Sequence, residues 1–297
     1  MHKFQHEILQ TADGYYGETK KYLRKDHREF VESIEVPLKN VYADYLSRVS
    51  PCTLENVTPV FAINSSDSPD EQKRKLKIRK SAHDLYEQKS GSMNNYWYRI
   101  IGKNGGEDLI CPICGVETCK HLDHYIPREQ MPELSVFTPN LIPLCADCNE
   151  KKSALWLNSS NERLIFNAFY DRLPNKAICE CQITIVESMP CAKVKVSAEL
   201  QEINADDKRI LSTIKELKLI SVWRKACNKA LRVEISKIRR GFKKDIWPNT
   251  EDYWNYIREI YNGAIADLPD TFFIEKLLYE GLIDSSEMKE WVCKTIK

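Results

Sequence analysis

Two Cys-x-x-Cys pairs constrain the fold of this 297-residue chain more than any other feature. The pairs are Cys111 with Cys114 and Cys145 with Cys148, and thirty residues separate them. Each pair can form a short knuckle that offers two thiolates to one tetrahedral zinc ion. Four sulfur ligands leave no open coordination position, so this zinc is expected to be structural and to tie the start of a small module to its end. Four independent core cysteines are the alternative, which the paired spacing disfavours.

The chain has eleven cysteines, a number that suggests disulfides in a small secreted protein. However, its first residues lack the apolar segment of a signal peptide, and no apolar run approaches the roughly 20 residues that span a bilayer. We therefore expect a cytoplasmic protein with reduced thiols. The other seven cysteines share no spacing and are expected in the core: Cys52, Cys119, Cys179, Cys181, Cys191, Cys227 and Cys293.

The segment between the two pairs predicts strand, loop, strand and helix in that order. The apolar run "HLDHYIP" is expected to be a strand that ends at Pro127, and "LIPLC" after Asn140 predicts a second strand. The string "ADCNEKKSALWL" then predicts a helix that begins next to Cys145. A zinc site alone would not require this arrangement of polar residues between the cysteines.

The rest of the chain predicts a mainly α-helical protein. It holds only ten glycines, and apolar residues recur at helical spacing in residues 15–48 and after residue 206. Pro37 is expected to kink or break the first helix, and two strands are expected to meet around a Met189–Pro190 break. We divide the chain into an N-terminal mainly helical region (residues 1–100), the cysteine module (101–170), a β-hairpin extension (171–205) and a C-terminal helical region (206–297).

The net charge of +1 conceals two blocks of opposite sign. Residues 208–244 hold thirteen Lys and Arg against two Glu, whereas residues 245–290 hold eleven Asp and Glu against three Lys and Arg. Because Lys and Arg neutralise phosphates and release counterions, the basic block favours a nucleic-acid partner over a merely solvated helix. A shorter basic run from Lys73 to Lys80 has the same two interpretations, and for it we favour the solvated helix. The aromatic-rich acidic end is expected to form a helical core or to dock a partner protein.

The strings "CPIC", "LDHYIP", "NLIPLC" and "CNEKKS" together resemble the HNH nucleases. That family has a ββα-metal fold, often with two flanking Cys-x-x-Cys zinc knuckles. The resemblance covers roughly residues 108–157, about a sixth of the chain. It implies an α+β protein in which a small zinc-stapled ββα-metal module is embedded in a mainly α-helical chain.

By position, the resemblance assigns the general base to His124 and the two protein ligands of a catalytic divalent ion to Asp123 and Asn149. Asn140 falls on the middle Asn, which braces the loop that holds the histidine. These residue types suit phosphodiester hydrolysis, because an imidazole with a pKa near 6.5 can deprotonate water near neutral pH. A carboxylate and an amide oxygen suit Mg²⁺ or Mn²⁺, which would neutralise charge on the phosphate.

An alternative register stays open at the first strand. His121 lies two residues before Asp123, so strand alternation would place both on one face and make them a metal pair. We favour His124 as the base, because the family pattern places the base directly after the Asp. Contacts to nucleic-acid phosphates are expected from basic residues of the module and of the basic block: Arg128, Lys151, Lys152, Arg239, Arg240, Lys243 and Lys244.

The resemblance implies a metal-dependent HNH endonuclease or nickase that hydrolyses DNA phosphodiester bonds, with RNA left open as a substrate. The alternative is a zinc-stapled nucleic-acid-binding module without catalysis, which has no chemical need for Asp123, His124, Asn140 and Asn149 together. The amino-acid sequence of the module is also similar to that of HNH proteins of bacterial antiphage systems, including those encoded beside an ATPase of the Septu type. That likeness implies a defence role and an ATPase partner, whereas a stand-alone restriction-like or mobile-element nuclease stays open.

Overall fold

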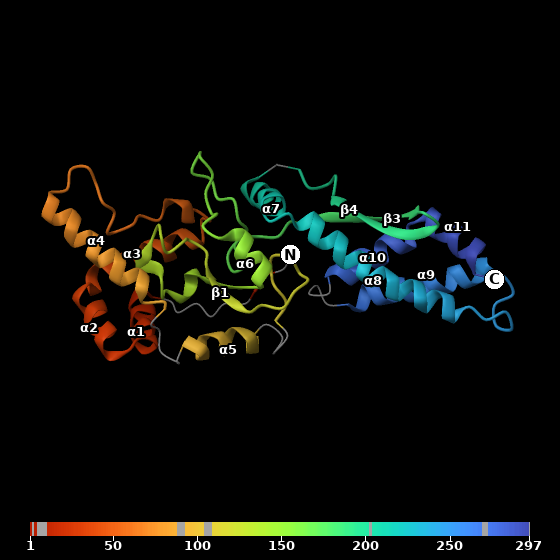
Figure 1. The fold of residues 1–297 in the computed structure, drawn as a ribbon, viewed down its shortest axis with the longest axis horizontal. Coiled ribbons are helices and arrows are strands. Elements are labelled where there is room, and N and C mark those ends of the chain that lie inside the picture. Colours follow the sequence, from red (N-terminus) through yellow and green to blue (C-terminus); the bar gives the residue numbers. More distant parts are fainter. Residues whose placement is uncertain are drawn as a thin grey trace. The chain divides into compact units, whose positions relative to one another are not determined.

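The computed structural model describes residues 1, 3–4, 11–87, 93–103, 109–201, 204–268 and 273–296. The chain divides into two compact units (Figure 1). The N-terminal unit contains residues 3–112 and 118–172, and the C-terminal unit contains residues 1–2, 113–117 and 173–297. No described helix combines the length and the apolar character that crossing a bilayer requires.

The N-terminal unit begins with helices that pack around the ring of Phe137. The rings of Tyr15, Tyr42 and Tyr45 lie with their centroids 5.2, 4.1 and 5.2 Å from that of Phe137, and all four side chains are buried. Tyr15 lies on α1 (Ala12–Tyr22), and Tyr42 and Tyr45 lie on α3 (Glu35–Val49). The other described helices of this region are α2 (Lys25–Ser33), the short helix η1 (Leu54–Asn56), α4 (Pro69–Asp84) and α5 (Met93–Lys103).

Pro37 does not kink a helix, although the predicted helix over residues 15–48 is broken. The breaks fall at residues 23–24 and at Ile34, so Pro37 lies in the first turn of α3. A proline is tolerated there because the backbone N–H groups of a first turn have no acceptor within the helix. Pro37 therefore helps to begin a helix.

The predicted ββα order is confirmed between the cysteine pairs. Strand β1 (His121–His124) pairs antiparallel with β2 (Leu141–Leu144), with His121 opposite Leu144 and His124 opposite Leu141. The connection between them contains two short helices, η2 (Pro132–Leu134) and η3 (Thr138–Asn140), and helix α6 (Ala146–Lys152) follows β2. The fold class is thus α+β, with a small ββα module in a mainly helical chain.

The C-terminal unit begins with an antiparallel hairpin of β3 (Cys179–Val186) and β4 (Met189–Val196). Its turn is formed by Glu187 and Ser188, whose φ angles are +48° and +65°. Two positive φ angles match the twist of a two-residue hairpin turn. The break expected at Met189–Pro190 was therefore placed two residues too late, and both residues already belong to β4.

The described helices of the C-terminal unit are α7 (Ala205–Glu216), α8 (Leu219–Gly241), α9 (Thr250–Asp267), α10 (Phe273–Ile283) and α11 (Ser286–Thr295) (Figure 1). Of these, α8, α10 and α11 pack on the hairpin. The side chain of Asn228 on α8 accepts a hydrogen bond from Ala192 N (3.0 Å) and donates one to Ala192 O (2.8 Å). Asn228 thereby fixes α8 to the outer edge of β4. At the acidic end of the chain, Tyr253, Trp254 and Tyr261 are buried, so this end contributes to a helical core.

The seven cysteines outside the two pairs are less uniform than expected. Cys119, Cys179 and Cys227 are buried, as predicted for core residues. The expectation was wrong for four that are only partly buried: Cys52, Cys181, Cys191 and Cys293.

Candidate functional site

The four cysteines of the two pairs come together in the structure. Their sulfur atoms lie within 4.8 Å of one another, and all four side chains are buried. Tetrahedral zinc with Zn–S bonds near 2.3 Å requires sulfur atoms about 3.8 Å apart, so the cluster fits such an ion. The backbone N–H of Cys148 also donates to the sulfur of Cys145 (3.4 Å), a contact that favours a thiolate. The predicted four-cysteine cluster is confirmed, and its chemistry suggests a structural zinc ion.

His124 ends β1 as a buried side chain with only 8% of its surface exposed. Its Nε2 atom lies 2.8 Å from the carbonyl oxygen of Ser135. Because a carbonyl oxygen only accepts, Nε2 carries the proton, and the lone pair of the neutral ring is at Nδ1. Burial lowers the pKa of His124 to about 4, so the ring is neutral near pH 7. The side chain thus has the protonation state of a general base.

The ring of Tyr86 packs edge-on against His124, with the ring centroids 4.5 Å apart. The Tyr86 hydroxyl donates to the carbonyl oxygen of Leu122 on β1 (2.8 Å). Tyr86 therefore contacts both the imidazole and the strand that carries it. The sequence analysis missed this residue, because nothing in its local pattern points to a strand 36 positions further along the chain.

Asp123 is held by Lys152, which lies on the last turn of α6. The Lys152 ammonium lies 2.7 Å from Oδ2 of Asp123 and donates to the carbonyl oxygen of His124 at 2.7 Å. Burial raises the pKa of the Asp123 carboxyl group, and the nearby ammonium opposes that shift. One buried cation thereby fixes both the carboxylate and the backbone of the adjacent histidine.

This position of Lys152 differs from the surface contact to phosphate that the sequence suggested. Only 1% of its surface is exposed, and its ammonium already has two partners. The physical reason is helical periodicity, since Lys152 follows the buried Cys148 by four residues and so lies on the inner face of α6. The spacing that places Cys148 in the cysteine cluster also turns Lys152 toward β1.

Asn140 is fully buried and clamps the loop that follows His124. Its Oδ1 accepts from the backbone N–H of Ile126 (2.9 Å), and its Nδ2 donates to Ile126 O (3.0 Å). Its own carbonyl oxygen accepts from Tyr125 N (2.8 Å). The bracing role assigned to Asn140 stays a prediction, and these three contacts supply the geometry that it requires.

The side chains of Asn149 and His121 are accessible to solvent. Asn149 is partly exposed on the second turn of α6, and its backbone N–H donates to Cys145 O (3.0 Å). His121 is exposed at the start of β1, at the opposite end of the strand from His124. The ligand role of Asn149 and the alternative pairing of His121 with Asp123 both stay predictions.

The basic residues expected at phosphates lie in two places. In the N-terminal unit, Arg128 pairs with Glu87 (2.7 Å) and Lys151 pairs with Asp147 (2.8 Å), so each already has a carboxylate partner. The C-terminal unit holds the four others, which are exposed on the last turn of α8 and just after it: Arg239, Arg240, Lys243 and Lys244.

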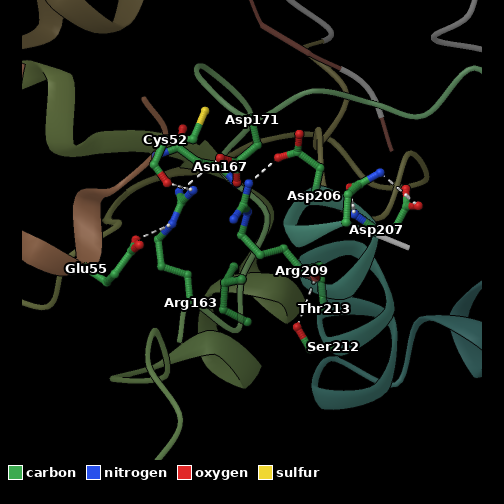
Figure 2. Close-up of polar contacts among 12 residues, drawn as sticks. Cys52, Glu55, Arg163, Asn167, Asp171, Asp206, Asp207, Arg209, Ser212 and Thr213 are labelled. Atoms are coloured by element: carbon green, nitrogen blue, oxygen red, sulfur yellow. Dashed lines mark hydrogen bonds and ion pairs between the residues drawn. The ribbon is translucent and has the colours of Figure 1, made fainter. Parts of the chain in front are cut away.

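A buried arginine supports the residue that follows His124. Arg163 lies 3.0 Å from the Glu55 carboxylate and 2.9 Å from that of Asp171, and it donates to the hydroxyl of Tyr125 (3.2 Å) and to Cys52 O (2.9 Å). Figure 2 shows Cys52, Glu55 and Asp171 around this guanidinium. Because Tyr125 directly follows His124, the network supports the end of β1.

Comparison with known proteins agrees with this geometry. Residues 111–155 match the model of the family described as HNH endonuclease, a range that includes both cysteine pairs and the whole ββα motif. The chain is also 33% identical over 76 residues to protein ea31 of Escherichia phage lambda. That similarity covers 25% of this chain and spans 25% of the phage protein. No solved structure matches the chain. The chain therefore carries an HNH endonuclease domain with a four-cysteine cluster.

Proposed function

We propose that this protein is a metal-dependent endonuclease or nickase that hydrolyses phosphodiester bonds of DNA. An HNH domain implies nuclease chemistry and a nucleic-acid substrate in general. The observation that carries the proposal is the state of His124, whose Nε2–H is bonded to Ser135 O while Nδ1 keeps its lone pair. Such a ring is prepared to accept a proton next to a carboxylate, and a binding module has no need for it.

In this proposal, Nδ1 of His124 removes a proton from the water that attacks the phosphorus atom. Asp123 and Asn149 would hold a divalent ion, because a carboxylate and an amide oxygen are hard ligands that suit Mg²⁺ or Mn²⁺. When bound, that ion supplies charge neutralisation at the scissile phosphate. The protonated Nε2 keeps the ring oriented during the transfer, since its bond to Ser135 O persists when the ring becomes charged.

Three buried side chains hold these groups in place. Lys152 contacts Asp123 and His124 O, and Asn140 fixes the backbone of Ile126. Arg163 contacts the hydroxyl of Tyr125. Displacements near 1 Å can cost about 10²-fold in rate, so this support is part of the catalytic design.

The experiment that tests the proposal is cleavage of supercoiled plasmid by purified protein in Mg²⁺ or Mn²⁺, with EDTA as the blank. His124→Ala should lose activity by about 10²–10⁴-fold, the usual size of positioned acid–base catalysis. Asp123→Ala and Asn149→Ala should also lose activity, and excess metal should restore part of it, since they weaken ion binding. Excess metal should leave His124→Ala inactive.

His121→Ala is the matched control, because it removes an imidazole from the other end of the same strand. It should keep most of the wild-type activity. An inactive His121→Ala beside an active His124→Ala would contradict His124 as the base. It would favour His121 and Asp123 as a metal pair. Wild-type protein that cleaves neither DNA nor RNA with any divalent ion would favour a nucleic-acid-binding module without catalysis.

We also propose that the exposed basic residues Arg239, Arg240, Lys243 and Lys244 add affinity for DNA phosphates. A defence role against phages and an ATPase partner stay predictions from the resemblance, and a cytoplasmic location stays a prediction from the sequence. The similarity to the phage lambda protein is distant and gives them no further support.

A further inference from the structure

Helix α4 contains the basic run of residues 73–80. Three of the six cations in this run already have hydrogen-bond or ion-pair partners within the protein. Arg74 forms two hydrogen bonds to the Glu71 carboxylate (3.0 and 2.8 Å). Lys75 pairs with Asp67 (2.8 Å), and Arg79 donates to two backbone carbonyl oxygens (3.1 Å each). The Arg74 pair lies within α4, whereas Lys75 and Arg79 join the helix to neighbouring segments of the N-terminal unit.

The other three cations of the run are different. Lys73, Lys77 and Lys80 are exposed, and within the described part of the chain none of them forms an ion pair. Their spacing of four and three residues puts them on one face of the helix, over a length of about 10 Å at 1.5 Å per residue. Like charges at this spacing repel and destabilise a helix. A line of unpaired lysines therefore favours an anionic ligand that offsets the repulsion.

Helix α4 is fixed to the strand that carries the candidate base. The two carbonyl oxygens that accept from Arg79 belong to Glu129 and Gln130, in the loop after β1. Tyr86 follows the end of α4 and contacts both Leu122 O and the ring of His124. The lysine face thus belongs to the same unit as the HNH motif and has direct structural connections to it.

We propose that Lys73, Lys77 and Lys80 bind the phosphate backbone of the DNA that flanks the cleaved bond, an inference that rests on the proposed function. The interpretation as a merely solvated face, which the sequence favoured, does not explain why the three cations without partners among the described residues share one face of α4 while the other three have partners in the protein. A row about 10 Å long that lies along the duplex axis spans about three phosphates of one strand, since these recur about every 3.4 Å of axis. The regular spacing of phosphates suits a straight row of lysines, and these residues lie outside the range that matches the HNH family.

The test measures binding in a full-length His124→Ala background, so that the DNA stays intact. Fluorescence anisotropy with a short duplex over a range of salt concentrations gives the slope of log K against log salt. Replacing Lys73, Lys77 and Lys80 together by Gln should reduce the magnitude of this slope by about 3, since each phosphate contact contributes about 0.9. The zinc content should not change, which shows that the module is folded.

Two single variants form a matched pair, because each removes one positive charge from the same helix. Lys77→Gln should lower the slope by about 1, and Arg74→Gln should leave it near the wild-type value, since Arg74 already binds Glu71. Equal slopes for these two variants, or an unchanged slope for the triple variant, would refute the lysine contact. If wild-type protein still nicks plasmid in that case, the proposed function survives. If wild-type protein fails to nick while the triple variant changes the slope, the contact survives and the nuclease assignment fails.

Discussion

The ββα module and the C-terminal unit maintain their structures by different means. The module has two strands of four residues and a helix of seven, and polar contacts join these elements beside their apolar side chains: the cysteine cluster, Lys152 with Asp123, and Asn140 with Ile126. The C-terminal unit has a helix of 23 residues and a core of aromatic and aliphatic side chains such as Trp223. Removing one polar partner should therefore damage the module more than the C-terminal unit.

The difference follows from the length of the elements. Strands of four residues and a helix of seven bury little apolar surface of their own, so the cysteine cluster and the buried polar contacts add to the packing that the N-terminal unit supplies. Those contacts are directional, and they hold side chains in positions that an apolar core would not specify. In the module the same contacts orient Asp123 and His124, so stability and the candidate catalytic geometry share the same residues.

The largest effect should come from Cys145→Ser. Removing one of four thiolates weakens metal binding that is coupled to folding, so the module should unfold locally and release about one zinc ion per chain. Metal analysis of the purified protein measures the loss, and hydrogen exchange should show lost protection in β1, β2 and α6, with protection kept in β3 and β4.

Cys293→Ser on α11 is the matched control, since it changes the same side chain in the C-terminal unit. It should leave zinc content and protection unchanged. Wild-type protein without zinc, or loss of zinc from both variants, would contradict a structural zinc site formed by the two Cys-x-x-Cys pairs.

Patterns local in sequence predicted much of this module. The paired cysteine spacing and the strand–loop–strand–helix order require only neighbouring residues, and both are confirmed. The resemblance also pointed to Asn140, whose contacts lie in the loop next to His124. The ligand and base assignments of Asp123, His124 and Asn149 stay predictions.

What the sequence could not provide depends on distant partners or on backbone angles. Lys152 was expected on the surface, because its burial depends on a carboxylate 29 positions earlier on another element. Nothing in the sequence around Tyr86 predicts its contact with His124. Arg163 pairs with Glu55, which lies in a distant part of the sequence. The hairpin turn was misplaced because Glu187 and Ser188 adopt positive φ without the glycine or asparagine that marks such turns.

Lys152→Met should have the next largest effect. It leaves the largely buried Asp123 carboxylate without its cation, which should lower the free energy of unfolding by about 3 kcal/mol. Denaturant unfolding measures this change, with hydrogen exchange in the module as the probe. The double variant Asp123→Asn with Lys152→Met should recover part of the loss, because no charge then stays buried and unpaired. A double variant less stable than Lys152→Met alone would contradict the pairing.

Asn228→Ala tests the C-terminal unit and should have a smaller effect. The change leaves the N–H and the carbonyl of the buried Ala192 without partners, at a cost of about 1–3 kcal/mol in the free energy of unfolding. Asn228→Asp keeps an acceptor for the N–H and should lose less. Amide exchange at Ala192 measures both variants, and the zinc content of the module should stay constant. An Ala variant as stable as wild type would show that apolar packing alone holds α8 to β4.

The smallest change in stability should come from replacing Arg239, Arg240, Lys243 and Lys244 together by Gln. These side chains are exposed, and the main loss is the contact of Arg239 with the Trp291 ring (5.1 Å), worth about 0.5 kcal/mol. If they bind DNA phosphates, affinity should fall and the salt dependence of binding should flatten, whereas Lys237→Gln should change little, since Lys237 already pairs with Glu234 (2.8 Å). An unchanged salt slope would assign this end of α8 to packing or to a protein partner, and would leave the lysine face of α4 as the proposed contact to the substrate.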